Sequence, residues 1–209
     1  MTKQEYEKDP KDYWEHPVSI GVGLDLYSGG PVPESQNPLW VKNIQQDIII
    51  NPGKDLCVDL GCGGGRYLGG TAPYFKKVIG VDFSINNIDK ARRHIESAGI
   101  KNVGFYLTSL ADMWEIQSGI VDFAYSVAVF MHMPNETRMA ALREIHRILR
   151  SDGRAVLLEI TSMEHGAFDC PDLTPLEWEN MLIEAGLVLD EKTGQETEGD
   201  FVRYKLHKE

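Results

Sequence analysis

One stretch of sequence decides the fold: Val58-Asp59-Leu60-Gly61-Cys62-Gly63-Gly64-Gly65-Arg66-Tyr67. It combines a short apolar strand, an acid near the end of that strand, and a run of glycines that leads into a helix. Glycines carry no Cβ atom and adopt positive φ angles, so this loop can press its main-chain N–H and C=O groups against a ligand. In an open α/β sheet such a loop follows the carboxyl end of the first strand, where ligands bind.

From about residue 55 onward, short apolar runs alternate with longer amphipathic runs, which is typical of successive strands and helices in a parallel sheet. The pattern predicts a doubly wound α/β domain in which the last two strands form an antiparallel edge. The expected strands are 55–60, 77–81, 103–107, 121–127, 154–160, 187–191 and 201–206, and the expected helices are 67–72, 85–98, 136–149 and 175–185.

Local signals mark several ends of these elements. Ser84 can cap one helix, and Gly99 stops the same helix. Thr174 with Glu177 three residues later forms a capping box at the last helix. The segment 151–153, Ser-Asp-Gly, predicts a turn directly before the next strand.

The glycine spacing argues against two other classes of nucleotide-binding protein. A dinucleotide fingerprint needs a third glycine where this chain has Arg66, and no GxxxxGK[ST] phosphate loop is present. These observations disfavour a nicotinamide-dependent oxidoreductase, a kinase and an ATPase.

A second acid, Asp82, ends the next apolar run, where a carboxylate can accept both hydroxyls of a ribose. The predicted ligand is therefore a nucleoside.

The motifs VDLGCGGGRY at 58–67 and GVDFS at 80–84 resemble the first two motifs of the class I S-adenosylmethionine-dependent methyltransferases. Segments 121–126 and 146–153 resemble the fourth-strand motif of that family and its helix-turn before strand five. The resemblance implies a Rossmann-like seven-stranded sheet of order 3-2-1-4-5-7-6 with strand 7 antiparallel. It also implies the cofactor S-adenosyl-L-methionine and a methyltransferase activity (EC 2.1.1).

The resemblance further implies which residues bind the cofactor. Asp59 would hold the amino group of its methionine end, Asp82 would bind its ribose, and Phe83 would pack beside its adenine unless it is an ordinary core residue. The implied set is Asp59, Gly61, Cys62, Gly63, Asp82, Phe83, Ser109, Leu110, Ser126 and Val127.

The adenine contact departs from the family pattern. Ser109 stands where the family often has an acid, so the adenine amine would be contacted either by Ser109 with the Leu110 main chain or by Asp112. At the end of the fourth strand, Ser126 would contact the cofactor or bond its own main chain.

His132 is the candidate catalytic residue. It follows the predicted fourth strand, where the family places residues that face the substrate, and the near-neutral pKa range of histidine suits a general base. The alternative is a structural histidine that holds its loop through a hydrogen bond to the main chain.

Recognition of the methyl acceptor in this family usually comes from segments outside the core. Here these segments are 1–38, a candidate arm or lid that precedes the methyltransferase domain at 39–209, and 161–171. Their aromatic and polar side chains fit a small or medium organic acceptor, or they simply cover the edge of the sheet. The substrate candidates are Tyr13, Trp14, Tyr27, His165 and Phe168.

Composition narrows the possible partners. The 209 residues favour one domain with additions, because a domain has about 150 residues. With 21 basic and 32 acidic side chains the net charge is -11, which would repel nucleic acid and makes it an unlikely partner. The 3 cysteines lack paired spacing, as do Glu159, Glu164, His165 and Asp169, so no metal site is expected.

The chain also lacks an apolar signal core near Met1, and no apolar stretch approaches the length of about 20 residues that a membrane helix needs. We therefore expect a cytoplasmic protein that does not span a membrane. Nothing in the sequence predicts an oligomeric state.

The function favoured is methyl transfer to an O, N, C or S atom of a small molecule. The alternatives are a non-catalytic regulatory module that binds the cofactor, and a methyltransferase of RNA or protein.

Overall fold

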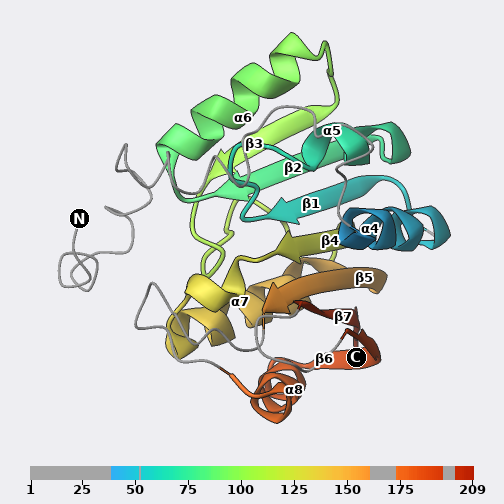
Figure 1. The fold of residues 1–209 in the computed structure, drawn as a ribbon, viewed down its shortest axis with the longest axis vertical. Coiled ribbons are helices and arrows are strands. Elements are labelled where there is room, and N and C mark those ends of the chain that lie inside the picture. Colours follow the sequence, from blue (N-terminus) through green and yellow to red (C-terminus); the bar gives the residue numbers. More distant parts are fainter. Residues whose placement is uncertain (1–38, 52, 161–172, 195–200) are drawn as a thin grey trace.

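The computed structural model describes residues 39–51, 53–160, 173–194 and 201–209 (Figure 1). Its centre is a seven-stranded sheet of order β3-β2-β1-β4-β5-β7-β6, the order expected from the family resemblance. The strands are β1 (Leu56–Leu60), β2 (Lys77–Asp82), β3 (Val103–Leu107), β4 (Val121–Val127), β5 (Leu149–Ile160), β6 (Leu187–Thr193) and β7 (Phe201–Lys208). The helices are α4 (Leu39–Ile50), α5 (Leu68–Thr71), η2 (Ala72–Tyr74), α6 (Ile85–Ser97), η3 (Phe130–His132), α7 (Asn135–Ile148) and α8 (Pro175–Glu184).

The direction of the strands fixes where a ligand can bind. Strands β1 to β5 pair in parallel, whereas β7 is antiparallel to both β5 and β6. Strand β1 pairs with β2 on one side and β4 on the other, so the order of the strands reverses at β1. The crevice at the carboxyl ends of these strands is the usual ligand-binding place in such sheets.

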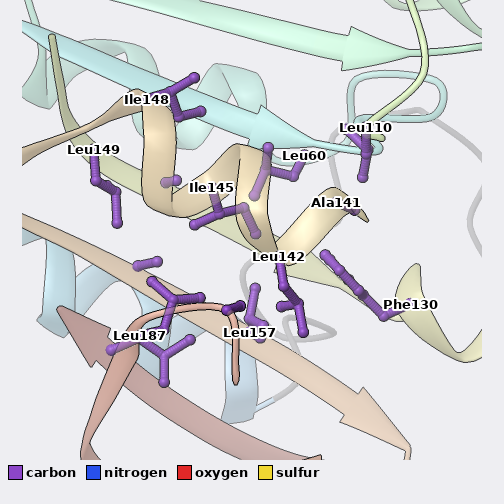
Figure 2. Packing of buried hydrophobic residues seen from close by; sticks show 14 of the residues in the cluster. Leu60, Leu110, Phe130, Ala141, Leu142, Ile145, Ile148, Leu149, Leu157 and Leu187 are labelled. Carbon is purple, nitrogen blue, oxygen red and sulfur yellow. The ribbon is translucent and has the colours of Figure 1, made fainter. Parts of the chain in front are cut away.

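Helices cover both faces of the sheet. One face packs against α4, α5 and α6, and successive residues of β1 divide between the faces: Cys57 belongs to this cluster and Val58 to the other. The second face packs against α7 and α8. Figure 2 shows this second cluster, in which Leu142 and Ile145 of α7 lie over the strands. Their spacing of three residues puts them on one side of the helix.

The predicted capping signals at α6 and α8 are confirmed. Ser84 Oγ accepts a hydrogen bond of 3.2 Å from Asn87 N. At α8, Thr174 Oγ1 accepts from Glu177 N while the Glu177 carboxylate accepts from Thr174 N, which completes the capping box.

The structure differs from the sequence prediction in two places. No element was expected over 39–50, where α4 forms; its buried contacts come from Ile44 and Ile48, but Ile49 and Ile50 are exposed, so the sequence has no clear amphipathic period. The segment 151–153, for which the sequence predicts a turn, lies within β5, but its pairing with β4 jumps from Val121–Leu149 to Phe123–Arg154, so the strand bulges there instead of ending in a separate turn. A Cβ atom on Gly153 would lie 2.7 Å from Val121 O and 3.1 Å from both Arg150 N and Arg150 O, so this glycine permits the bulge and the close approach of β4.

Two features are absent from the described ranges. No helix in this part of the chain is long and apolar enough to cross a bilayer. No group of three or more His, Cys, Asp or Glu side chains in the same ranges is placed to hold a metal ion. The proposed arm or lid over 1–38 lies outside the described residues.

A buried acid fastens the amino-terminal ends of the central strands. Asp122 at the start of β4 is 1% exposed. Its Oδ2 accepts hydrogen bonds from Asp55 N at 2.9 Å and Leu56 N at 2.7 Å, while its Oδ1 pairs with Arg150 at 2.7 Å. One side chain therefore connects β1, β4 and β5 at the edge opposite the ligand crevice.

We expect Asp122→Asn to lower the free energy of unfolding by about 1–3 kcal/mol, because one amide oxygen cannot replace two charged acceptor oxygens for buried donors. Asp152→Asn is the matched control: Asp152 also pairs with Arg150 but is exposed, and its change should stay within about 0.5 kcal/mol. Urea unfolding of both variants measures the difference. Equal stability of Asp122→Asn and the unaltered protein would contradict the role of Asp122 in holding β1, β4 and β5 together.

Candidate functional site

The carboxyl ends of β1, β2 and β4 bring the residues expected to bind the cofactor to one edge of the sheet (Figure 1). Asp59 lies opposite Gly80 of β2 and Tyr125 of β4. The glycine loop then bends across the end of β2, where Gly61 N and Cys62 N both donate to Val81 O, at 2.8 and 2.9 Å. The loop is thereby fixed over the reversal point of the strand order.

Asp82 links this loop to α6. Its Oδ2 accepts from Gly63 N at 2.9 Å, and its Oδ1 accepts from Ser84 N at 2.9 Å and from Asn87 Nδ2 at 3.2 Å. The carboxylate is 6% exposed. Asp82 therefore sets the shape of the glycine loop, a role that the sequence did not predict beside the expected contact with a ribose.

Two glycines of the loop meet different surroundings. Gly61 has a φ of +73°, and a Cβ atom there would lie 2.6 Å from Val129 Cγ1, so only glycine allows the turn after β4 to pack against the loop. Gly63 has a φ of +50°, and a Cβ atom there would meet nothing within 4 Å among the described atoms. The main chain at Gly63 therefore faces open space.

Asp59 is buried beneath the same loop, with 2% of its surface exposed. Burial raises its pKa to about 7, although a hydrogen bond from the Tyr125 hydroxyl opposes the rise and the charge of Asp82 adds to it. Tyr125 Oη also lies 2.9 Å from Thr71 Oγ1, which holds the phenol in place. Within the described residues, Asp59 Oδ2 has no hydrogen-bond partner.

An unpartnered, buried carboxylate oxygen is unusual, because such a group normally finds a donor. Asp59 Oδ2 could therefore accept a hydrogen bond from a ligand that carries a donor, and preferably a positive charge. The ammonium group of S-adenosylmethionine has both properties. The open main chain at Gly63 gives room for the same ligand. The residues present therefore fit the cofactor that the sequence resemblance implies.

The turn after β4 carries the catalytic candidate. His132 is the last residue of η3 and is half-buried. Burial, together with the positive charge of Arg138, lowers the pKa of His132 to about 4. The imidazole is therefore neutral at pH 7 and does not have to lose a proton before it can accept one.

The remaining predicted residues lie around this edge. Val127 is half-buried and packs on the cluster beside α4, α5 and α6. Ser126 is fully buried and its hydroxyl donates to Glu159 Oε1 at 3.1 Å, so this side chain is engaged inside the protein. Phe83 is half-buried directly after Asp82.

The segment after β3 holds the candidates for the adenine contact. Thr108 N donates to Asp82 O at 3.1 Å, which joins this segment to the end of β2. Ser109 is exposed, whereas Leu110 is 5% exposed and packs in the core. Asp112 is exposed, and its main-chain N–H bonds Ser109 O at 3.0 Å. Both arrangements considered for the adenine amine remain compatible with these positions.

The expected substrate residues lie outside the described residues; they are Tyr13, Trp14, Tyr27, His165 and Phe168. Sequence reasoning missed three residues that shape the site: Tyr125, Val129 and Glu159. Tyr125 and Val129 resemble ordinary core residues. Glu159 gave a usable signal, because an acid in the otherwise apolar run Val156-Leu157-Leu158-Glu159-Ile160 needs buried partners.

Comparison with known proteins agrees with this geometry. The sequence profile of a family described as Methyltransferase domain matches residues 58–157. Among solved structures, the chain is similar to geranyl diphosphate C-methyltransferase from Streptomyces coelicolor A3(2), with a TM-score of 0.72, 17% identity and 98% of each chain covered. Residues 58–157 therefore match a methyltransferase domain.

Two further similarities bear on what this methyltransferase domain acts on. It is 36% identical over 114 residues to the tRNA (carboxymethyluridine(34)-5-O)-methyltransferase ALKBH8 of Macaca fascicularis, an alignment that covers 54% of this chain but only 16% of that protein. It also resembles the structure of the (4+2)-cyclase SpnF, with a TM-score of 0.76, 13% identity, and coverage of 99% of this chain and 94% of that one. The fold is therefore shared with a protein named for a different reaction.

The raised pKa of Asp59 has a consequence for the stability of the methyltransferase domain. Between about pH 4 and pH 7 the folded state binds a proton that the unfolded state has lost, so stability falls as the pH rises and stays low above pH 7. Asp59→Asn removes this dependence of stability on pH, although Glu159, whose pKa is also about 7, keeps a similar one. We expect Asp59→Asn to melt a few degrees higher than the unaltered protein at pH 8.

Differential scanning calorimetry at pH 5 and pH 8 checks this expectation. The variant should gain most at pH 8 and little at pH 5. Asp89→Asn, which changes an exposed acid on α6, serves as the control and should shift neither melting temperature. A lower melting temperature for Asp59→Asn at pH 8 would show that its carboxylate is stabilising, contrary to the burial argument.

Proposed function

We propose that this protein transfers the methyl group of S-adenosylmethionine to a small or medium organic acceptor. The observation that carries the proposal is the buried, unpartnered Oδ2 of Asp59 beside a glycine loop with open space at Gly63, seen among the described residues. The matched part of the chain is a small share of its ALKBH8 relative, so the activity of the whole protein is part of the proposal.

The chain's own residues would bind and orient the cofactor. Asp59 would pair with the ammonium group, the main chain at Gly63 would lie along the methionine end, and Asp82 would accept the ribose hydroxyls. Phe83, with Leu110 or Ser109, would border the adenine. When bound, the cofactor supplies a sulfonium methyl group that is already activated, so the protein mainly has to align the acceptor and exclude water.

His132 would be the residue that takes a proton from the acceptor where one must leave. Its neutral imidazole at pH 7 and its position in the turn next to the glycine loop support this role. Its low pKa makes it a weak base, which favours acceptors that are nucleophilic before any proton is removed. The structural role of the same histidine is the alternative.

A small acceptor is supported by the net charge of -11 and by the similarity to a geranyl diphosphate C-methyltransferase over the whole chain. The segments 1–38 and 161–171 would complete the acceptor pocket. RNA is the second candidate, favoured by the identity with a tRNA methyltransferase. A cytoplasmic location is part of the proposal and is supported by the free, buried thiols of Cys57 and Cys62.

Transfer of radiolabelled methyl groups tests the choice of acceptor. The full chain would be incubated with methyl-labelled S-adenosylmethionine and either a low-molecular-weight cell extract or total tRNA. We expect label in the small-molecule fraction. Label only in tRNA would replace the first candidate by the second, and binding of the cofactor without transfer to any fraction, protein included, would support a non-catalytic module.

Binding of S-adenosylmethionine should become tighter as the pH rises from 5.5 to 7.5. Asp59 must lose its proton to pair with the ammonium group, and its pKa of about 7 places that loss within this range. Calorimetry in buffers of different ionisation enthalpy should therefore detect proton release near pH 6, since the cofactor binds the ionised form. An affinity that does not change with pH would argue against Asp59 as the partner of the ammonium group.

Gly63→Ala should weaken binding of S-adenosylhomocysteine at least tenfold, because a methyl group would occupy the space assigned to the ligand. The chain offers a matched control in Gly99→Ala. Gly99 at the end of α6 also has a positive φ, +70°, and open space around its Cβ position, but lies away from the site. Both variants carry the same backbone strain, so calorimetry should show lost affinity for Gly63→Ala alone.

A further inference from the structure

Glu159 is a fully buried acid that the proposed chemistry does not use. It lies near the end of β5, outside the segment 58–157 that matches the methyltransferase family. A buried carboxylate is costly unless its oxygens accept hydrogen bonds or pair with a cation. Its contacts therefore indicate what it does.

The partners of Glu159 come almost entirely from one turn. Oε1 accepts from Val129 N at 3.3 Å as well as from the Ser126 hydroxyl, and Oε2 accepts from Met131 N at 3.3 Å. The N–H of Phe130 also bonds the carboxylate. Consecutive main-chain amides that converge on one carboxylate form an anion-binding nest around a group of the protein itself.

The turn needs such a partner because its backbone is strained. Ala128 has a φ of +54°, and it is the only described residue other than glycine with a positive φ. The left-handed region is unfavourable for a residue with a Cβ atom, so the conformation persists only where its surroundings hold it. Glu159 bonds the N–H groups directly after Ala128 and so opposes the strain.

A second buried charge holds the other side of the same turn. Arg138 of α7 is 2% exposed, and its Nε donates to Phe130 O at 2.8 Å. The Phe130 ring enters the core beside α7 (Figure 2). Its centroid lies 6.0 Å from that of the Trp178 ring. The N–H groups of the turn are thus held by Glu159 and a carbonyl by Arg138.

The 128–132 turn contacts the glycine loop and also carries His132. Val129 packs against Gly61 of the glycine loop so closely that a Cβ atom there would lie 2.6 Å from Val129 Cγ1. His132 is the last residue of the same turn. We propose that Glu159 is a positioning residue, whose carboxylate fixes the 128–132 turn and through it the glycine loop and His132.

The burial of Glu159 agrees with a role other than stabilising the folded protein. Burial raises the pKa of Glu159 to about 7 in spite of the hydrogen bonds that lower it, so the ionised form is unfavourable in the folded protein. A neutral side chain of the same shape would be cheaper for folding. The gain from the carboxylate lies in the geometry of the turn.

Glu159→Gln tests the proposal at pH 8. The amide keeps the shape and one acceptor oxygen, but it turns an NH2 group toward amides that need an acceptor. We expect hydrogen exchange at Val129, Phe130 and Met131 to accelerate at least tenfold, while exchange in α7 stays unchanged and the melting temperature does not fall. We also expect the affinity for S-adenosylhomocysteine to fall about tenfold, as expected when a buried acceptor is lost.

Asp122→Asn is the matched control. Asp122 is likewise a buried acid that accepts two main-chain N–H groups, but at the opposite edge of the sheet. It should lower the melting temperature and leave the affinity for S-adenosylhomocysteine unchanged. If Glu159→Gln behaves in the same way, with faster exchange throughout the protein and unchanged affinity, Glu159 is merely structural and the proposal is overturned.

Ala128→Gly gives an independent readout, because glycine adopts a positive φ without strain. Added to Glu159→Gln, it should restore part of the lost affinity and protection. No recovery would overturn the claim that the carboxylate opposes strain at Ala128. The affinity arm rests on the proposed function, whereas hydrogen exchange does not. Failure of the unaltered protein to bind S-adenosylhomocysteine would therefore count against the function, and exchange would still decide the role of Glu159.

Discussion

The site depends on the parallel register of β1 between β2 and β4. This register puts Asp59 opposite Gly80 on one side and Tyr125 on the other. Gly80 leaves room for the Cys62 thiol, since a Cβ atom there would lie 2.9 Å from Cys62 Sγ, and Tyr125 supplies the hydroxyl that bonds Asp59. A slip of one residue would exchange Asp59 for Leu60 on that face and separate the acid from both neighbours.

Buried acids at the two edges of the sheet have opposite roles. At the amino-terminal edge, Asp122 finds all its partners within the protein and stabilises the ends of three strands. At the carboxyl edge, Asp59 and Glu159 are held at pKa values of about 7 by burial, so their ionised forms are unfavourable before a ligand binds. The fold is stabilised at one edge and strained at the other, which is where open α/β sheets bind ligands.

The sequence predicted most of the fold because its signals are local. Strand periodicity, the Ser84 cap and the Thr174 box each act within a few residues, and the structure confirms them. Helix α4 escaped prediction because its stability rests on distant partners, such as the 3.1 Å pair between Asp47 and Arg203. The cofactor edge followed from family motifs, but the roles of Asp82 and Glu159 in shaping loops depend on contacts between distant segments. The apolar run around Glu159 signals that this acid needs buried partners, but not which partners they are.

The proposed role of the core of this domain is to bind and orient the cofactor. The core does not by itself determine which reaction takes place. The same fold occurs in a geranyl diphosphate C-methyltransferase and in the (4+2)-cyclase SpnF. A neutral His132 with a pKa of about 4 is poorly matched to remove a proton near pH 7, since a general base works best when its pKa lies near the working pH. The nucleophilic strength must then come chiefly from the acceptor itself. Selectivity for one acceptor over another must come from the residues that enclose it. The proposed positioning of the 128–132 turn by Glu159 then matters more than proton removal, because this turn holds Val129 against Gly61 of the glycine loop.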